Sequence, residues 1–141
     1  MAEPIPLRGT APRSASAPAP SLRGRRVLVV EDEYMLAEDL RCELEGAGAA
    51  VLGPVPSVAD ALALLARGPP PDAAILDVNL GGEMVFPVAE ALRERGVPFV
   101  FATGYGSAGL DEAYRGATVL RKPFDRPELE RALAEALDGA P

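Results

Sequence analysis

The sequence predicts an α/β fold in which five parallel strands alternate with helices, a (βα)5 arrangement. Short apolar runs alternate along the chain with longer segments that have the apolar period of a helix, and glycine or proline clusters separate them. Strands that alternate with helices pair in parallel through right-handed crossovers. The chain has 141 residues, 48% of them apolar, which is enough for one core and therefore one domain.

Residues 1–24 differ in composition from the rest of the chain, with prolines at 4, 6, 12, 18 and 20. So many prolines oppose a regular helix, and the stretch has little apolar surface to bury. We expect a flexible tail over residues 1–24 and a folded domain over residues 25–141. A cleaved targeting peptide and a docking arm for an acidic partner are the alternatives.

The first three elements follow from apolar spacing. Val27–Val30 is a short apolar run typical of a strand buried on both faces. Met35–Glu45 has the period of a helix, and Gly46 ends it. Cys42 falls outside the apolar stripe, so we expect it to face outward. Ala50–Val55 is the second strand. The leucines of the helical stripe are Leu36, Leu40 and Leu44.

A second helix begins after Ser57, because Ser57 with Asp60 three residues later is an N-terminal capping pattern. The third strand is Ala73–Leu76, and Asn79–Gly82 is expected to be its exit loop. A helix around Val85–Arg95 follows.

The remaining elements are a fourth strand over Phe99–Ala102 and a fifth over Ala117–Leu120. Between them, residues 104–116 include four glycines, so any helix there is short and lies near Leu110–Arg115. Asp125, with Glu128 three residues later, caps the last helix.

Polar residues follow four of the apolar runs. Glu31 and Asp32 follow the first strand, Asp77 the third, Thr103 the fourth, and Lys122, the only lysine of the chain, the fifth. Because ligands bind at the carboxyl ends of parallel strands, we expect these side chains to meet at one site. Any one of the acids alone could simply be a helix cap. The four ends together predict a phosphoryl-accepting site.

The expected site suits Mg²⁺, which binds one or a few carboxylates, keeps some waters and completes its shell with phosphate oxygens. Glu31, Asp32, Asp77 and the backbone carbonyl of Asn79 are the expected ligands. One oxygen of Asp77 remains free to act as the phosphoacceptor.

Thr103 and Lys122 would receive the anion, the hydroxyl by hydrogen bonding and the ammonium by charge.

Composition excludes several other functions. The chain has no histidine, and its only cysteine leaves no partner for an internal disulfide and fits a reducing, cytoplasmic compartment. No apolar run is long enough to cross a membrane. Residues 27–141 hold nine basic and twenty acidic side chains, so we expect no direct nucleic-acid binding by the folded part. Neither a dinucleotide-binding glycine motif nor a phosphate-binding P-loop occurs.

With these residues in this order, the chain resembles the receiver domain of two-component response regulators over residues 26–138. The resemblance implies the flavodoxin-like three-layer fold with strand order 2-1-3-4-5, and a peptide bond before Pro123 that is commonly cis. It also implies that Asp77 is the phosphoacceptor, that Thr103 is a switch residue, and that a sensor histidine kinase is the donor.

A narrower resemblance rests on the run Phe101-Ala102-Thr103-Gly104-Tyr105-Gly106. It is similar to the signature of the "FAT GUY" receivers, which are mostly stand-alone or belong to general-stress regulators and are fed by HWE-type histidine kinases. Ordinary receivers carry an aromatic residue three positions before the lysine, where this chain has Val119. Tyr105 is therefore expected to serve as the second switch residue.

We therefore interpret the chain as a single-domain response regulator that is phosphorylated on Asp77 with Mg²⁺ and dephosphorylates itself slowly, without being an enzyme otherwise. It would signal by contact with a downstream protein or drain phosphoryl groups from a shared kinase. One alternative is an acidic adaptor that is not phosphorylated. Another is a Mg²⁺-dependent phosphatase with an Asp nucleophile, but Asn79 stands where such enzymes have a second acid.

Overall fold

The computed structural model describes residues 22–104, 110 and 112–139. Within this part, five strands form one parallel sheet in the order β2-β1-β3-β6-β7. Counted without the small hairpin β4–β5, this is the expected order 2-1-3-4-5, so the flavodoxin-like fold is confirmed. The strands of the sheet are β1 (Arg26–Val30), β2 (Ala50–Val55), β3 (Ala73–Asp77), β6 (Phe99–Thr103) and β7 (Thr118–Arg121).

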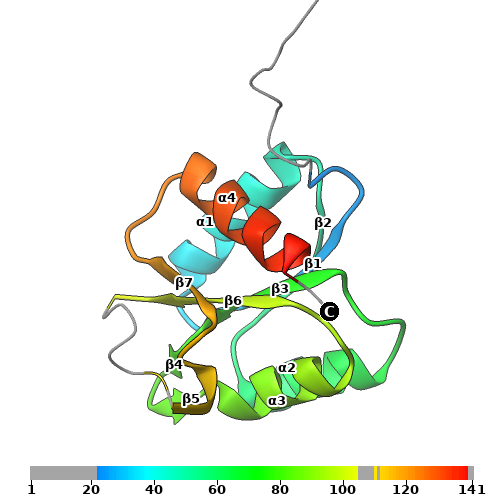
Figure 1. Cartoon of the computed structure of the whole chain (residues 1–141), viewed down its shortest axis with the longest axis vertical. Coiled ribbons are helices and arrows are strands. Elements are labelled where there is room, and N and C mark those ends of the chain that lie inside the picture. Colours follow the sequence, from blue (N-terminus) through cyan, green and yellow to red (C-terminus); the bar gives the residue numbers. More distant parts are fainter. Residues whose placement is uncertain (1–21, 105–109, 111, 140–141) are drawn as a thin grey trace, which may run out of the picture.

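Helices cover both faces of the sheet and make three layers (Figure 1). Helices α1 and α4 pack on one face, around Leu44 and Leu133, which are fully buried. Helices α2 and α3 pack on the other face, with the buried side chains of Val88 and Leu92. The helices are α1 (Tyr34–Gly46), α2 (Val58–Ala66), α3 (Phe86–Glu94) and α4 (Arg126–Asp138).

Two of the helices begin at the caps that the sequence predicts. The hydroxyl of Ser57 accepts a hydrogen bond from the backbone N–H of Asp60 at 3.1 Å. Asp125 and Glu128 form a reciprocal capping box at the start of α4. Each cap pairs backbone N–H groups that the helix itself leaves without partners. Both start positions were therefore readable from local sequence.

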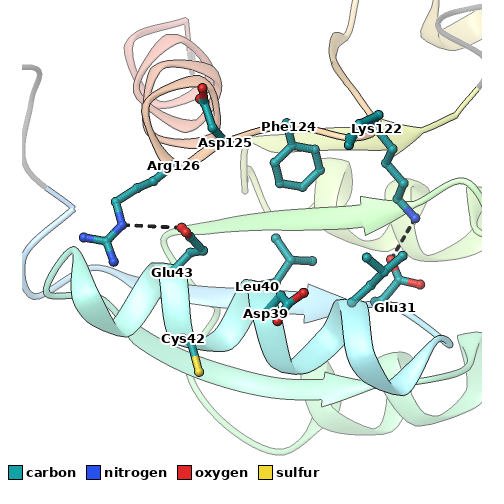
Figure 2. A pocket seen from close by; sticks show the side chains of 11 residues that line it. Glu31, Asp39, Leu40, Cys42, Glu43, Lys122, Phe124, Asp125 and Arg126 are labelled. Atoms are coloured by element: carbon teal, nitrogen blue, oxygen red, sulfur yellow. Dashed lines mark hydrogen bonds and ion pairs between the residues drawn. The ribbon is translucent and has the colours of Figure 1, made fainter.

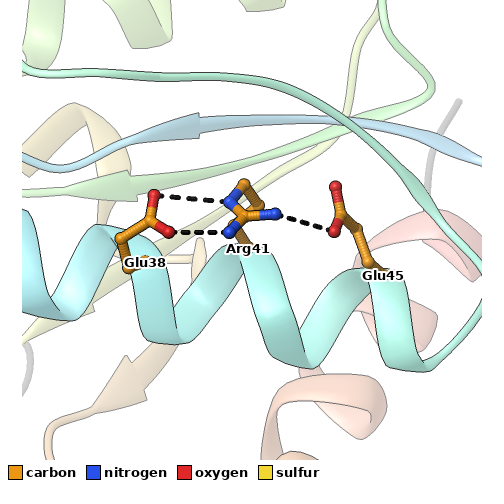
Figure 3. A network of polar contacts seen from close by, with 3 residues as sticks. All are labelled: Glu38, Arg41 and Glu45. Carbon is orange, nitrogen blue, oxygen red and sulfur yellow. Dashed lines mark hydrogen bonds and ion pairs between the residues drawn. The ribbon is translucent and has the colours of Figure 1, made fainter.

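Helix α1 carries a charged outer face (Figure 3). Arg41 lies between Glu38 and Glu45, with N···O distances of 2.7 and 2.9 Å. These i,i+3 and i,i+4 pairs each stabilise an exposed helix by about 0.2–0.5 kcal/mol. Cys42, the next residue, is exposed as expected. The opposite face of α1 is thus the one that packs on the sheet.

The expected exit loop after β3 is wrong, because residues 79–84 form a two-stranded hairpin. Strand β4 (Asn79–Leu80) pairs with β5 (Glu83–Met84) in antiparallel register. Gly81 and Gly82 both have positive φ values, +67° and +101°, as the tight type I′ hairpin turn requires. The sequence contained this signal as a Gly-Gly pair, but strands of two residues are too short to show an apolar period.

Any helix near Leu110–Arg115 was expected to be short, and the structure has a short helical turn within that range. The described part of this connection contains a single 3-10 turn, Glu112–Tyr114. The glycines lower the stability of an α-helix here by roughly 1 kcal/mol each relative to alanine. Tyr114 is buried in the core, and it fixes the turn to the sheet. The predicted switch residue Tyr105 lies outside the described residues.

The packed part of the chain includes residues before position 25. Leu22 is buried in the cluster that α1 and α4 cover, and the backbone N–H of Gly24 donates to the carbonyl of Gly48 at 2.8 Å. Among the described residues, none of the helices combines the length and the apolar character needed to cross a bilayer.

Candidate functional site

The structure brings the predicted polar residues together at the carboxyl edge of the sheet. Glu31, Asp77 and Thr103 stand at or just after the ends of β1, β3 and β6, and all three are buried. Asp32 is exposed beside them. Lys122 follows β7, and its backbone N–H donates to the carbonyl of Thr103 at 2.9 Å. The parallel sheet thus places side chains from four strands at one edge.

Three of these residues form an acidic cluster, defined by Glu31, Asp32 and Asp77. One carboxylate oxygen from each lies within 4.8 Å of the other two. Ionised carboxylates at this spacing repel one another, and a divalent cation relieves the repulsion. Oxygen donors on an incomplete shell fit a hard cation such as Mg²⁺. The residues present therefore fit the metal that the sequence predicts.

The hairpin fixes the backbone at Asn79, whose carbonyl is one of the expected metal ligands. The N–H of Val85 donates to the carbonyl of Val78 at 3.0 Å. In an antiparallel ladder, residues alternate between hydrogen-bonded and non-hydrogen-bonded pairs. Val78 and Val85 form a hydrogen-bonded pair. The next pair along the hairpin, Asn79 with Met84, is therefore a non-hydrogen-bonded one, so the Asn79 carbonyl points away from β5. Its side chain is used in the turn, accepting from Gly82 N–H at 2.6 Å.

Lys122 forms ion pairs with two members of the acidic cluster. Its ammonium lies 2.9 Å from Glu31 and 3.4 Å from Asp77 (Figure 2 shows the shorter pair). Glu31 also accepts a hydrogen bond from the N–H of Glu33 at 3.1 Å, so both of its oxygens are engaged. The peptide bond between Lys122 and Pro123 is cis, as the resemblance implies.

The environment of Asp77 changes its proton affinity. The pKa of its carboxyl is raised to about 7 from an ordinary 3.8, first because burial disfavours the charged form and second because Glu31 carries a like charge. The Lys122 ammonium offsets part of this. Burial lowers the pKa of Lys122, but its hydrogen bond to Glu31 and the charge of Asp77 outweigh burial and raise that pKa.

The raised pKa predicts a pH-dependent stability. Asp77 favours folding most below pH 3.8, and this contribution is lost as the pH rises through about 7. Without divalent cations, Asp77→Asn should therefore be more stable than the wild type, and its advantage should grow by about 2 kcal/mol between pH 5 and pH 8. Urea unfolding at both pH values measures this.

The matched control for this measurement is Asp60→Asn, an exposed acid on α2. Its difference from the wild type should not change between the two pH values. An advantage of Asp77→Asn that stayed constant from pH 5 to pH 8 would contradict the raised pKa.

The sequence did not reveal a groove of about 620 Å³ beside the acidic cluster (Figure 2). It lies between α1 and the segment that joins β7 to α4. Its walls are apolar at Leu36, Leu40 and Phe124, and the Arg126–Glu43 ion pair at 3.5 Å lies at the end far from Lys122. Leu36 belongs to the predicted core stripe but is only half-buried, so part of that stripe forms the groove.

The fold and the site together define a class of protein: a flavodoxin-like domain with an acidic pocket and a lysine at the carboxyl edge of its sheet. A family model described as "Response regulator receiver domain" matches residues 27–134. The chain therefore belongs to the response regulator receiver domains of two-component systems. Domains of this family bind Mg²⁺ at an acidic pocket and are phosphorylated by histidine kinases.

Among curated proteins, the chain is 28% identical over 114 residues to the phyllosphere-induced regulator PhyR of Methylorubrum extorquens. It is 32% identical over 112 residues to the sensory transduction protein LytT of Bacillus anthracis. These matches cover 79% and 77% of this chain. They cover only 43% and 45% of the relatives, so the chain spans less than half of their length.

Among solved structures, the chain is similar to SdrG from Sphingomonas melonis Fr1, with 47% identity and a TM-score of 0.71. The match covers 84% of this chain and 98% of that one. It is also similar to PhyR from Brucella abortus, with 25% identity, a TM-score of 0.71 and coverage of 83% and 50%. These likenesses confirm the receiver fold.

Proposed function

We propose that this chain is a single-domain response regulator that accepts a phosphoryl group on Asp77 in a Mg²⁺-dependent reaction. The observation that carries the proposal is the position of Asp77. Its carboxylate is buried, lies 3.4 Å from the Lys122 ammonium and shares the acidic cluster with Glu31 and Asp32. A carboxylate placed between a cation site and an ammonium is a nucleophile with charge compensation on two sides.

Asp32, Asp77 and the carbonyl of Asn79 would hold the metal, with Glu31 assisting. When bound, Mg²⁺ supplies positive charge against the phosphoryl oxygens and against the acidic cluster. Glu31 is already engaged by Lys122 and by Glu33 N–H. Asp32 is exposed, so it is the residue of the cluster most open to a cation arriving from solvent.

The donor in this proposal is a phosphohistidine of a sensor kinase. One Asp77 oxygen forms the new O–P bond while the P–N bond to the donor imidazole breaks. The departing imidazole keeps the electron pair of that bond and takes up a proton. The product is an acyl phosphate on Asp77, which water hydrolyses slowly. The protein contributes position and charge, as in phosphoryl transfer generally.

The groove offers the donor a surface next to Asp77. Two exposed apolar side chains, Tyr34 at 73% and Met35 at 69%, directly precede the groove residue Leu36 in the first turn of α1. The run that includes Thr103 and Tyr105 supports a kinase of the HWE type. Transfer from each purified kinase of the source cell, measured by ³²P and with Asp77→Asn as the blank, tests this. Failure of every kinase to transfer would refute a kinase-fed regulator.

Lys122 and Thr103 are proposed to respond to the phosphoryl group. Lys122→Ala should still be labelled at Asp77 by acetyl phosphate, because the nucleophile and the cation ligands remain. It should lose the amide chemical-shift change of Thr103 on phosphorylation, because no ammonium links the phosphoryl group to β7. NMR with and without beryllofluoride measures this response.

Lys122→Arg should restore that response only in part, since a guanidinium is a planar fork and an ammonium a compact charge. A full Thr103 response in Lys122→Ala would show that the lysine does not transmit the signal.

We propose that the phosphorylated chain acts through contact with a downstream protein, or that it withdraws phosphoryl groups from a shared kinase.

A further inference from the structure

Tyr114 lies in an aromatic cluster on the α3 face of the sheet, defined by Phe86, Phe99, Phe101 and Tyr114. Its side chain is 4% exposed. Its ring stacks on Phe86 with centroids 5.3 Å apart, and it meets Phe101 edge-on at 5.6 Å and Phe99 edge-on at 6.2 Å. Offset-stacked and edge-on pairs are the favoured arrangements of aromatic rings. The Tyr114 ring therefore has a well-defined position in the core.

Helix α3 holds Tyr114 by polar contacts as well. The Tyr114 hydroxyl donates to Glu90 at 3.3 Å. The guanidinium of Arg93 lies 4.4 Å from the centre of the Tyr114 ring and donates to the carbonyl of Ala113 at 3.3 Å. Phe86, Glu90 and Arg93 recur every three or four residues, so they share one face of α3. This face fixes both the position and the orientation of the ring.

Strand β7 has no aromatic residue at the position that pairs with Phe101 of β6. Val119 pairs with Phe101 in the β6–β7 register, and Val119 packs against the same core cluster as Tyr114. A valine side chain is much smaller than an aromatic one. Tyr114 supplies the ring beside Phe101 that Val119 does not. The sequence predicted Tyr105 as the second switch residue. The structure shows that another tyrosine, Tyr114, is buried in the core beside Phe101.

The cluster is connected to the acidic pocket through strand β6. Phe99, Phe101 and Thr103 alternate along the strand, so their side chains lie on one face. Phe101 is fully buried, and Thr103 ends the strand beside Lys122. A close-packed interior moves between discrete arrangements and does not deform gradually. Phe101 is thus the residue next to Thr103 on this face of β6, and its ring contacts Tyr114.

We propose that Tyr114 is a positioning residue for Thr103, so that the packing of its ring and the binding of a phosphoryl group at Asp77 are energetically coupled. The proposal rests on the proposed phosphoryl acceptance at Asp77. Coupling between two sites is reciprocal. If the phosphoryl group shifts the Tyr114 ring, removing the ring must change the affinity for the phosphoryl group by the same factor.

The test measures the affinity of the full chain for beryllofluoride with Mg²⁺, in the wild type, Tyr114→Leu and Leu133→Ala. Leu133 is a fully buried residue of α4, which packs on the opposite face of the sheet. Its variant therefore weakens the core without contacting the aromatic cluster. Tyr114→Leu should change the affinity by at least about fivefold. Leu133→Ala should stay within about twofold. Equal affinities in the two variants would overturn the proposal.

A second measurement uses the wild type alone and does not depend on whether a variant folds. The ring resonances of Tyr114 should shift when beryllofluoride and Mg²⁺ are added. Binding at Asp77 with unmoved Tyr114 resonances would overturn this inference and leave the proposed function intact. A wild type that bound no beryllofluoride would instead overturn the proposed function, and the inference with it.

Discussion

Asp77→Ala is expected to abolish phosphorylation of this chain. Asp77 is buried at the end of β3, belongs to the acidic cluster with Glu31 and Asp32, and lies 3.4 Å from the Lys122 ammonium. Alanine removes the carboxylate oxygens on which we propose that the acyl phosphate forms. Incubation with acetyl phosphate and Mg²⁺, followed by intact-mass measurement, should show one added phosphoryl group on the wild type and none on the variant. Hydroxylamine should release the group, as it does from acyl phosphates.

The control for this experiment is Asp60→Ala, which removes an exposed acid on α2 that is not part of the acidic cluster. It should be labelled like the wild type. Label that persisted in Asp77→Ala would place the acceptor on another residue. A wild type that took up no phosphoryl group from either acetyl phosphate or a kinase would favour an acidic adaptor that is not phosphorylated.

Asp32→Asn is expected to weaken Mg²⁺ binding at least tenfold, which is a loss of about 1.4 kcal/mol or more. Asp32 is exposed, so the substitution costs little packing, yet its oxygen lies within 4.8 Å of oxygens from Glu31 and Asp77. An amide keeps the shape of the side chain but removes its charge, and Mg²⁺ prefers charged oxygen donors. Titration calorimetry at pH 8, where Asp77 is mostly ionised, measures the affinity.

Glu33→Gln is the matched control, because Glu33 is the neighbouring exposed acid and its carboxylate is not part of the acidic cluster. It removes the same charge and should change the affinity by much less than Asp32→Asn. Equal losses in the two variants would mean that general negative charge attracts the metal and that Asp32 is not a ligand. A divalent cation that binds near Asp77 should also lower the pH at which that carboxyl ionises.

Several features of the fold could be predicted because their causes are local. The strand β1 is a run of adjacent apolar residues, and the capping box of α4 joins residues three positions apart. The glycines of residues 104–116 likewise foretold a weak helix. The short hairpin at Asn79–Met84 was not predicted, because strands of two residues are too short to show an alternation of apolar and polar residues. The Gly81-Gly82 pair was the one local signal of its turn.

The residues of the site were also predictable, but their pairing was not. A parallel sheet brings the ends of its strands to one edge, so polar residues after four strands had to converge. The Lys122 ammonium lies closer to Glu31 than to Asp77. Glu31 and Lys122 are 91 positions apart in the sequence, so no local pattern could predict this pairing. The raised pKa of Asp77 has the same origin, because burial and a neighbouring charge both come from distant parts of the chain.

The sequence by itself thus determined the order of the elements, the parallel sheet and the chemical types gathered at its edge, because apolar period and strand ends are properties of neighbouring residues. Only the tertiary structure decided which side chains touch. It seated Tyr114 against Phe86 and Phe101, turned the Asn79 carbonyl away from β5, and left Leu36 in a groove and not in the core. Each of these depends on how separate elements pack, and packing in a dense interior is settled by the whole set of contacts at once.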